Sequence, residues 1–231
     1  MGRRGAAGVA AGQRAGRRLD LGPQCRGLCG GGRGPRRPGR PAADLPVIGG
    51  VVAVEVNLSC PNLAGKSMFA HDAAAAAEVM ACTAVAGLPR WAKLSPNTDR
   101  LVSVAEACAG AGADAVTLTN TLLGLVIDTD SRRPALGGGG GGVSGAGMGP
   151  IAVRAVWDVA GALPDLPIVG VGGVHDADSA LQLLMAGASA VQVGTATFAD
   201  PRAPVRVLDE LASWCEGHGV ATIGELVGAA R

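Results

Sequence analysis

The stretch NLSCPN places one cysteine, Cys60, between two side-chain amides, Asn57 and Asn62. It follows VAVEV, an apolar, β-branched run typical of a buried strand, and Pro61 ends that strand because proline cannot donate to a sheet. Thiols react as thiolates, which neighbouring donors stabilise. Cys60 is therefore a candidate reactive group. The alternative is a small buried thiol beside a turn, the commoner role of a lone cysteine.

Two glycine-containing turns suggest a second kind of chemistry. GVGG at 170–173 and VGTA at 193–196 each end an apolar strand and precede a helical stretch. Backbone amides at such turns cradle a phosphate, and barrels often bind phosphate after their last two strands. No GxGxxG motif followed by an acidic residue occurs, so a dinucleotide fingerprint is not supported. We therefore expect a phosphate site that includes Gly172, Gly173, Gly194 and Thr195.

The elements that position these groups alternate regularly from about residue 47. Apolar strands are followed by alanine-rich helical stretches, and a long glycine-rich loop precedes the third helix. Five such units predict a parallel sheet covered by helices, either an open doubly wound sheet or a β/α barrel. Polar or glycine residues follow every strand, which favours a barrel whose loops converge on one face. The predicted strand and helix pairs are 52–59 with 72–86, 90–96 with 98–111, 115–120 with 150–162, 167–173 with 176–186, and 190–196 with 203–217.

The composition excludes several classes of protein. Hydrophobic residues make up 48% of the 231 residues, which is enough for a substantial core. No apolar run approaches the roughly 20 residues that cross a bilayer, so we expect no membrane span. The six cysteines form no CxxC pair, and the three histidines have no ligand spacing. We therefore predict neither a disulfide framework nor a metal site, and a reducing cytoplasmic setting.

The first 46 residues differ in character from the rest. Residues 1–50 hold ten arginines against Asp20 and Asp44, whereas residues 51–231 hold ten basic and seventeen acidic residues. The Gly/Arg/Pro-rich composition predicts a low-complexity segment without stable structure. It could be a nucleic-acid or anionic-surface arm, a targeting peptide, or a stretch outside the evolved fold, such as the product of a shifted reading frame. We assign the folded domain to residues 47–231.

Several motifs together resemble those of a known enzyme family. NLSCPN, WAKLSPN, TLTNT, GGVSG, GVGGV and AGASAVQVGTA occur in the order found in class 1 dihydroorotate dehydrogenases. The resemblance covers about residues 50–231 and implies an FMN-dependent β/α barrel that oxidises dihydroorotate to orotate in pyrimidine synthesis. Residues 1–46 have no counterpart of the family's first three strands, so the barrel is expected to be incomplete. Class 2 members carry serine at the position of Cys60.

The resemblance also implies roles for individual residues. Cys60 corresponds to the base that removes a proton from C5 of dihydroorotate while a hydride leaves C6 for the flavin. Lys93 corresponds to a lysine that stabilises the negative charge of reduced FMN. The substrate-binding positions are Asn57, Asn62, Asn120 and Thr121. The FMN-binding positions are Asn57, Lys93, Thr119, Gly145, Gly172, Gly173, Gly194 and Thr195.

The resemblance extends to partners and leaves alternatives open. It favours the class 1 variant that reduces NAD through an iron–sulfur and FAD subunit, and it implies a homo-oligomer if the barrel is complete. We expect no bound nucleic acid and no membrane association. A dihydropyrimidine dehydrogenase-like enzyme is one alternative, although those proteins usually lack an asparagine at the position of Asn62. An inactive fragment of the barrel or a basic-armed binding protein is another.

Overall fold

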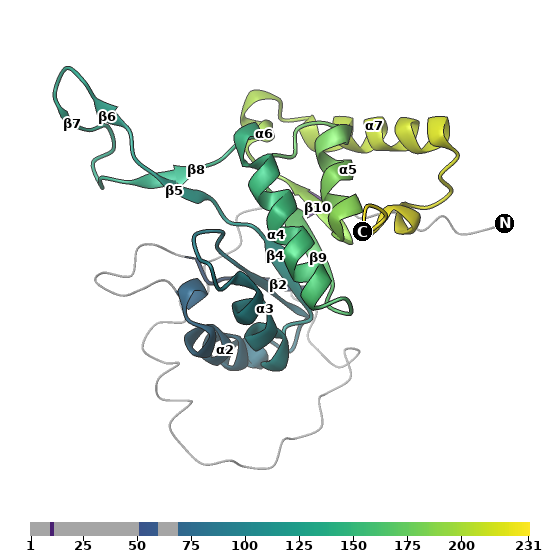
Figure 1. Cartoon of the computed structure of the whole chain (residues 1–231), viewed down its shortest axis with the longest axis horizontal. Coiled ribbons are helices and arrows are strands. Elements are labelled where there is room, and N and C mark those ends of the chain that lie inside the picture. The colour runs from purple at the N-terminus through teal and green to yellow at the C-terminus, as the bar shows by residue number, and fades with distance from the viewer. Residues whose placement is uncertain (1–9, 12–50, 60–68) are drawn as a thin grey trace, which may run out of the picture.

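The computed structural model describes residues 10–11, 51–59 and 69–231, and its largest feature is a parallel sheet (Figure 1). All neighbouring strands in this sheet run parallel, in the order β1-β10-β9-β4-β3-β2. Of residues 1–46 only β1 is described, so the predicted division of the chain at residue 46 stays a prediction. The strands are β1 (Ala10–Ala11), β2 (Val54–Asn57), β3 (Arg90–Lys93), β4 (Ala115–Leu118), β9 (Ile168–Val171) and β10 (Ala190–Val193).

Helices follow the strands as the sequence predicts, and their ends have identifiable causes. Asp72 begins α2 by accepting bonds from the backbone N–H groups of Ala74 and Ala75. Gly219 ends α7 with φ of 67°, a conformation that glycine adopts without strain. The main helices are α2 (Ala73–Cys82), α3 (Leu101–Gly110), α4 (Gly149–Ala162), α5 (Ala177–Ala186) and α7 (Ala203–His218), with 3-10 turns η2 (Phe69–His71), η3 (Thr83–Ala86), η4 (Ala146–Met148) and η5 (Ile223–Leu226).

The sheet curves so that its distant strands meet across its inner face. Glu55 lies on β2, at one edge of the sheet, and Gln192 lies on β10, separated from β2 by three strands. The Nε2 of Gln192 nevertheless donates to Oε2 of Glu55 at 2.9 Å. A flat sheet would hold these strands far apart, because neighbouring strands are about 4.8 Å apart. The prediction of an incomplete β/α barrel is confirmed.

The core lies between the sheet and its helices. All four residues of β4 are buried, as the continuous apolar pattern of a doubly covered strand predicts. Consecutive helices pack on one another, α2 on α3, α4 on α5, and α5 on α7. Side chains such as Ile168, Leu183 and Val156 are at most 1% exposed. Each such side chain contributes roughly 1.5–3 kcal/mol through its removal from water.

The segment after β4 departs from the prediction of a long glycine-rich loop. It forms two antiparallel ribbons that project from the body of the chain (Figure 1), β5 (Leu122–Gly124) with β8 (Gly141–Val143), and β6 (Ile127–Asp128) with β7 (Arg133–Pro134). Gly141 and Gly142 of the glycine run pair with β5. Backbone pairing needs no side chain, so the glycines do not prevent a strand here.

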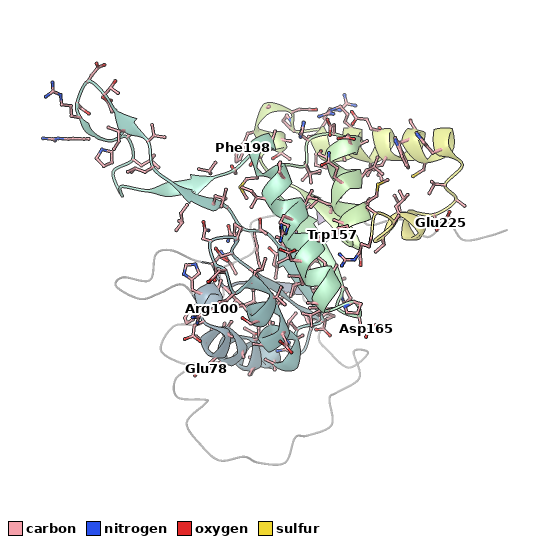
Figure 2. All side chains as sticks on the ribbon, in the orientation of Figure 1. Glu78, Arg100, Trp157, Asp165, Phe198 and Glu225 are labelled. Atoms are coloured by element: carbon pink, nitrogen blue, oxygen red, sulfur yellow. The ribbon has the colours of Figure 1, made fainter. Side chains whose placement is uncertain are left out.

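Two large aromatic side chains, Trp157 and Phe198, are exposed (Figure 2). Trp157 on α4 lies under the guanidinium of Arg231, whose carbon is 4.5 Å from the ring centroid. Arg231 also donates to the carbonyl of Trp157 at 2.7 Å, which fixes the last residue of the chain against α4. Phe198 lies on α6 (Ala196–Ala199), a short helix before α7 that the sequence pattern did not predict, and it is 90% exposed.

Candidate functional site

A cavity of about 350 Å³ lies at the carboxyl ends of the central strands. This volume falls in the usual range of small-molecule and cofactor sites, about 300–1,000 Å³. The last residue of β3 and the loops after β4, β9 and β10 contribute to its wall, as the barrel prediction requires. Nine residues singled out from the sequence line it: Lys93, Thr119, Asn120, Thr121, Gly145, Gly172, Gly173, Gly194 and Thr195.

The glycine turn after β9 holds a backbone conformation that other residues rarely adopt. Gly172 and Gly173 have φ of 126° and 81°. A Cβ on Gly173 would lie 2.5 Å from the backbone nitrogen of Gly149, the first residue of α4. The turn therefore passes directly against the start of that helix, which only glycine allows. A Cβ on Gly194, after β10, would meet no atom within 4 Å, because it would point into open space.

Thr119 and Lys93 place polar groups on the cavity wall. Thr119 is 3% exposed, and its Oγ1 is buried without a hydrogen-bond partner among the described residues. A buried hydroxyl without a partner costs free energy, so this atom is suited to a bound ligand. Lys93 Nζ lies 3.7 Å from Oε1 of Glu55, and the Lys93 side chain is 25% exposed. The cavity wall therefore includes the ammonium of Lys93, whose charge Glu55 partly neutralises.

The predicted substrate amides come together beside this cavity. Asn57 ends β2, and its Oδ1 accepts a bond of 3.0 Å from Nδ2 of Asn120, which follows β4. The same oxygen accepts from the backbone N–H of Ser59 at 3.1 Å. Asn120 in turn accepts from the backbone N–H of Thr121 at 2.8 Å. Asn57, Asn120 and Thr121 thus form one hydrogen-bonded group, and amide groups bind rings with alternating donors and acceptors.

Asn97 is a structural residue of the site that the sequence reasoning did not assign. Its Nδ2 donates to the carbonyl of Thr121 at 2.9 Å, and its Oδ1 accepts from the backbone N–H of Leu123 at 2.8 Å. It also donates to Oγ of Ser95, which is fully buried. Asn97 therefore joins the loop after β3 to the start of β5. Its position in WAKLSPN, after a strand end, was the available signal.

Charged side chains of α7 bond to the segment that follows β9. His175 is exposed but also lines the cavity, and its Nδ1 is 2.7 Å from the carbonyl of Gly173. Arg206 on α7 donates to the carbonyl of His175 at 2.9 Å and to Glu210 at 2.7 Å. Glu210 accepts from the backbone N–H of Ala177 at 2.9 Å. Helix α7 thus supports the loop that carries the glycine pair.

Asp176 caps α5 directly after this loop. Asp176 and Ser179 form a capping box, in which Oγ of Ser179 accepts from the backbone N–H of Asp176 at 3.1 Å and the Asp176 carboxylate accepts from the backbone N–H of Ser179. The carboxylate accepts two bonds in all, one from that N–H at 2.9 Å and one from the hydroxyl of Ser179 at 2.7 Å. These two bonds lower the pKa of the Asp176 carboxyl, the hydroxyl bond most, and the charges of His175 and Arg206 lower it further. The capping box therefore fixes the loop at the cavity and the start of α5 together.

Two cysteines of the described residues, Cys108 and Cys215, lie in helices and have thiols with a raised pKa. Cys108 is fully buried in α3, and burial raises the pKa of its thiol to about 12. Burial also raises the pKa of Cys215 on α7, and the charge of Glu225 adds to this shift. Cys60 and Asn62, the proposed base and its neighbour, lie outside the described residues.

The described residues contain no group of three or more His, Cys, Asp or Glu side chains placed to hold a metal ion. None of the helices within residues 69–231 is both long enough and apolar enough to span a membrane.

The chain is similar to dihydroorotate dehydrogenases. A family model described as dihydroorotate dehydrogenase matches residues 47–214. The chain is 45% identical over 190 residues to the dihydroorotate dehydrogenase B (NAD(+)) catalytic subunit of Pelobacter propionicus, covering 81% of the chain and 62% of that protein. It is 47% identical over 194 residues to the corresponding subunit of Desulforudis audaxviator, covering 83% and 63%. The chain therefore spans less than two thirds of these curated relatives.

The fold has a similar counterpart among solved structures. The structure described as DHODH in complex with ferulenol, from Eimeria tenella, superposes with a TM-score of 0.62 at 22% sequence identity. The similarity covers 77% of this chain and 53% of that one. It supports the barrel architecture.

Proposed function

The chain belongs to the dihydroorotate dehydrogenase family, and on that premise we propose that it forms the catalytic part of a cytoplasmic, FMN-dependent oxidoreductase. Its reaction is the oxidation of dihydroorotate to orotate in pyrimidine biosynthesis. The observation that carries the proposal is the cavity itself. Nine residues chosen from sequence motifs, spread from Lys93 to Thr195, surround one space of about 350 Å³.

The residues present fit FMN. The turns at Gly172 and Gly173 and at Gly194 and Thr195 offer backbone amides to a phosphate, and the space next to Gly194 is open. The hydroxyl of Thr119 has no partner among the described residues and can bond the flavin ring. When bound, FMN supplies a two-electron acceptor for the hydride of the substrate.

Lys93 stabilises charge on the bound cofactor, and Asn57 and Asn120 orient the substrate. The ammonium of Lys93 stabilises negative charge that develops on the ring system in the cavity. The Asn57–Asn120 pair orients the dihydropyrimidine ring through its donors and acceptors, and Thr121 extends this group. Because the side chains of Asn57 and Asn120 are bonded to each other before substrate arrives, little reorganisation of this pair is required on binding.

Cys60 is the proposed base, which would place the chain in the cysteine-using class. It removes a proton from C5 of dihydroorotate while the hydride leaves C6, so two hydrogens leave and the C5–C6 double bond forms. Asn62 completes the substrate contacts. Ser59, whose N–H bonds to Asn57, directly precedes Cys60 in the sequence, which supports this assignment.

The relatives' names favour one electron acceptor. They are catalytic subunits of a dihydroorotate dehydrogenase B that uses NAD⁺. We therefore propose that NAD⁺ would be the final electron acceptor, reached through a partner subunit with an iron–sulfur cluster and FAD, and that the catalytic subunit forms a homo-oligomer. Residues 47–231 are the proposed catalytic unit, with residues 1–46 as a separate low-complexity segment.

Turnover by the purified chain, loaded with FMN, tests the proposal. Reduction of a dye acceptor is followed with dihydroorotate and, separately, with dihydrouracil. Preference for dihydroorotate supports the proposed function, and preference for dihydrouracil supports the dihydropyrimidine dehydrogenase alternative. FMN binding without turnover of either substrate would identify an inactive part of the barrel and contradict the proposal.

A further inference from the structure

Glu55 is the one acidic side chain that bridges four strands on the inner face of the described sheet. From β2 its carboxylate reaches Lys93 on β3, Thr117 on β4 and Gln192 on β10. Thr117 Oγ1 donates to Oε2 at 2.8 Å, and Gln192 Nε2 donates to the same oxygen at 2.9 Å. The other oxygen, Oε1, lies 3.7 Å from Lys93 Nζ. One carboxylate oxygen is thus held by two neutral donors while the other faces the ammonium.

This carboxylate does not line the cavity, whereas Lys93 does. Glu55 therefore reaches the proposed flavin site only through Lys93. The side chains of Lys93 and Glu55 are 25% and 27% exposed, so water screens the pair less than it would screen a surface pair. A carboxylate at this distance offsets much of the field that the ammonium projects into the cavity.

We propose that Glu55 is a positioning residue that holds Lys93 at the cavity wall and offsets its charge, and so weakens the binding of reduced, anionic FMN relative to oxidised FMN. The inference rests on the proposed function, because it takes FMN as the ligand beside Lys93. Its consequence is a lower reduction potential for the bound flavin, which favours onward transfer of the electrons.

Glu55→Gln removes the negative charge of the side chain and keeps its size and shape. Glutamine has the size of glutamate, and its amide oxygen still accepts from the hydroxyl of Thr117 or from Lys93. Lys93 then lacks its counter-charge, so reduced FMN gains affinity. A unit charge roughly 10–12 Å from the centre of the ligand at an effective dielectric constant of about 20 corresponds to about a tenfold change in the ratio of the two dissociation constants.

The experiment measures the dissociation constants of oxidised and of reduced FMN for the full chain, without oxygen. We expect E55Q to shift their ratio about tenfold toward reduced FMN, equal to a rise of about 30 mV for a two-electron couple. Lys93→Gln should shift the ratio in the opposite direction. Thr117→Val is the matched control, since it removes a donor to Glu55 but leaves the carboxylate, and its ratio should stay within about twofold of the parent.

The ratio of the two dissociation constants distinguishes an effect of charge from an effect on folding. A loss of folded protein weakens the apparent binding of oxidised and of reduced FMN equally and leaves the ratio unchanged. An unchanged ratio in E55Q, or a shift in the direction of K93Q, would overturn this inference while leaving the proposed function intact. A parent chain that binds no FMN would overturn both. If circular dichroism shows E55Q to be unfolded, Glu55→Asp keeps the charge and should retain the parent ratio; a tenfold shift there would also contradict the inference.

Discussion

The side-chain oxygen of Asn57 accepts a hydrogen bond of 3.0 Å from the side-chain amide of Asn120, although 63 positions separate the two residues. Asn57 ends β2 and Asn120 follows β4, with β3 between these strands. The backbone N–H of Asn120 donates to the carbonyl of Leu94, and that of Thr119 to the carbonyl of Val171. The loop after β4 is thereby fixed between β3 and β9, where its amide meets Asn57.

Asn120→Ala should therefore weaken substrate binding more than it weakens folding. It removes a proposed substrate contact and leaves Asn57 without one of its donors. A lost hydrogen bond with an unsatisfied partner costs about 1–3 kcal/mol, which corresponds to roughly a 10–100-fold rise in the KM for dihydroorotate. Steady-state kinetics measure the KM, and FMN affinity serves as the control. A variant with the parent's KM would exclude Asn120 from the substrate site.

Two glycines of the proposed phosphate site should respond differently to alanine. Gly194→Ala should leave the fold intact, since its Cβ meets no atom within 4 Å, but should weaken FMN binding because the methyl group enters the cavity. Gly173→Ala should destabilise the fold, because its Cβ would lie 2.5 Å from the backbone of Gly149 at a φ of 81°. Urea unfolding and FMN titration measure the two effects. Equal stability loss in both variants would contradict the described geometry.

The capping of α5 predicts a particular dependence on pH. The lowered pKa of Asp176 means that its ionised form stabilises the folded chain above the ordinary carboxyl pKa of about 3.8. This contribution is lost as the pH falls through the folded-state pKa, below that value. Asp176→Ala should cost about 1 kcal/mol at neutral pH, and the difference from the parent should shrink at acid pH. Urea midpoints between pH 7 and pH 3 measure it.

A constant difference between the two chains across that pH range would show that the Asp176 charge does not contribute. Ser179→Ala is the matched variant, because it removes the hydroxyl that lowers the Asp176 pKa most. It should reduce the pH dependence while keeping the bond from the backbone N–H.

The thiol of Cys108 should be inert in the folded chain. With its pKa raised to about 12 by burial, only about one thiol in ten thousand is ionised at pH 8, and the thiolate is the reactive form. We expect iodoacetamide to leave Cys108 unmodified in the native chain and to modify it in urea, as peptide mass spectrometry would show. Modification at equal rates in both states would contradict its place in the core of α3.

Much of the fold follows from local patterns, and the exceptions have physical reasons. The strand and helix ranges could be predicted because buried parallel strands are continuous apolar runs and helices show a different hydrophobic period. The ribbons β5–β8 and β6–β7 were not predicted, because glycine-rich and charged sequence has no strand pattern there. Their pairing comes from backbone groups, such as those of Gly141 and Gly142.

For the site, too, individual residues could be predicted from local sequence, whereas the contacts between them could not. Family motifs marked the residues that face the cavity. The contacts that hold them could not be predicted, because they join distant parts of the chain. Glu55 meets Gln192 across 137 positions, and Arg206 reaches the carbonyl of His175 from another helix. His175 gave only the signal of a lone histidine, since its role depends on the turn at Gly173.

The most direct test of the proposed function is rapid anaerobic mixing of the FMN-loaded chain with dihydroorotate, followed by flavin absorbance. The parent should lose the absorbance of oxidised flavin, and Cys60→Ser should do so ~10²–10⁴-fold more slowly near neutral pH, because serine is a far weaker acid and its conjugate base is scarce. The variant's rate should recover in part as pH rises, while its FMN affinity stays that of the parent. A Cys60→Ser variant that reduces its flavin as fast as the parent, or a parent whose flavin dihydroorotate does not reduce, would contradict the account.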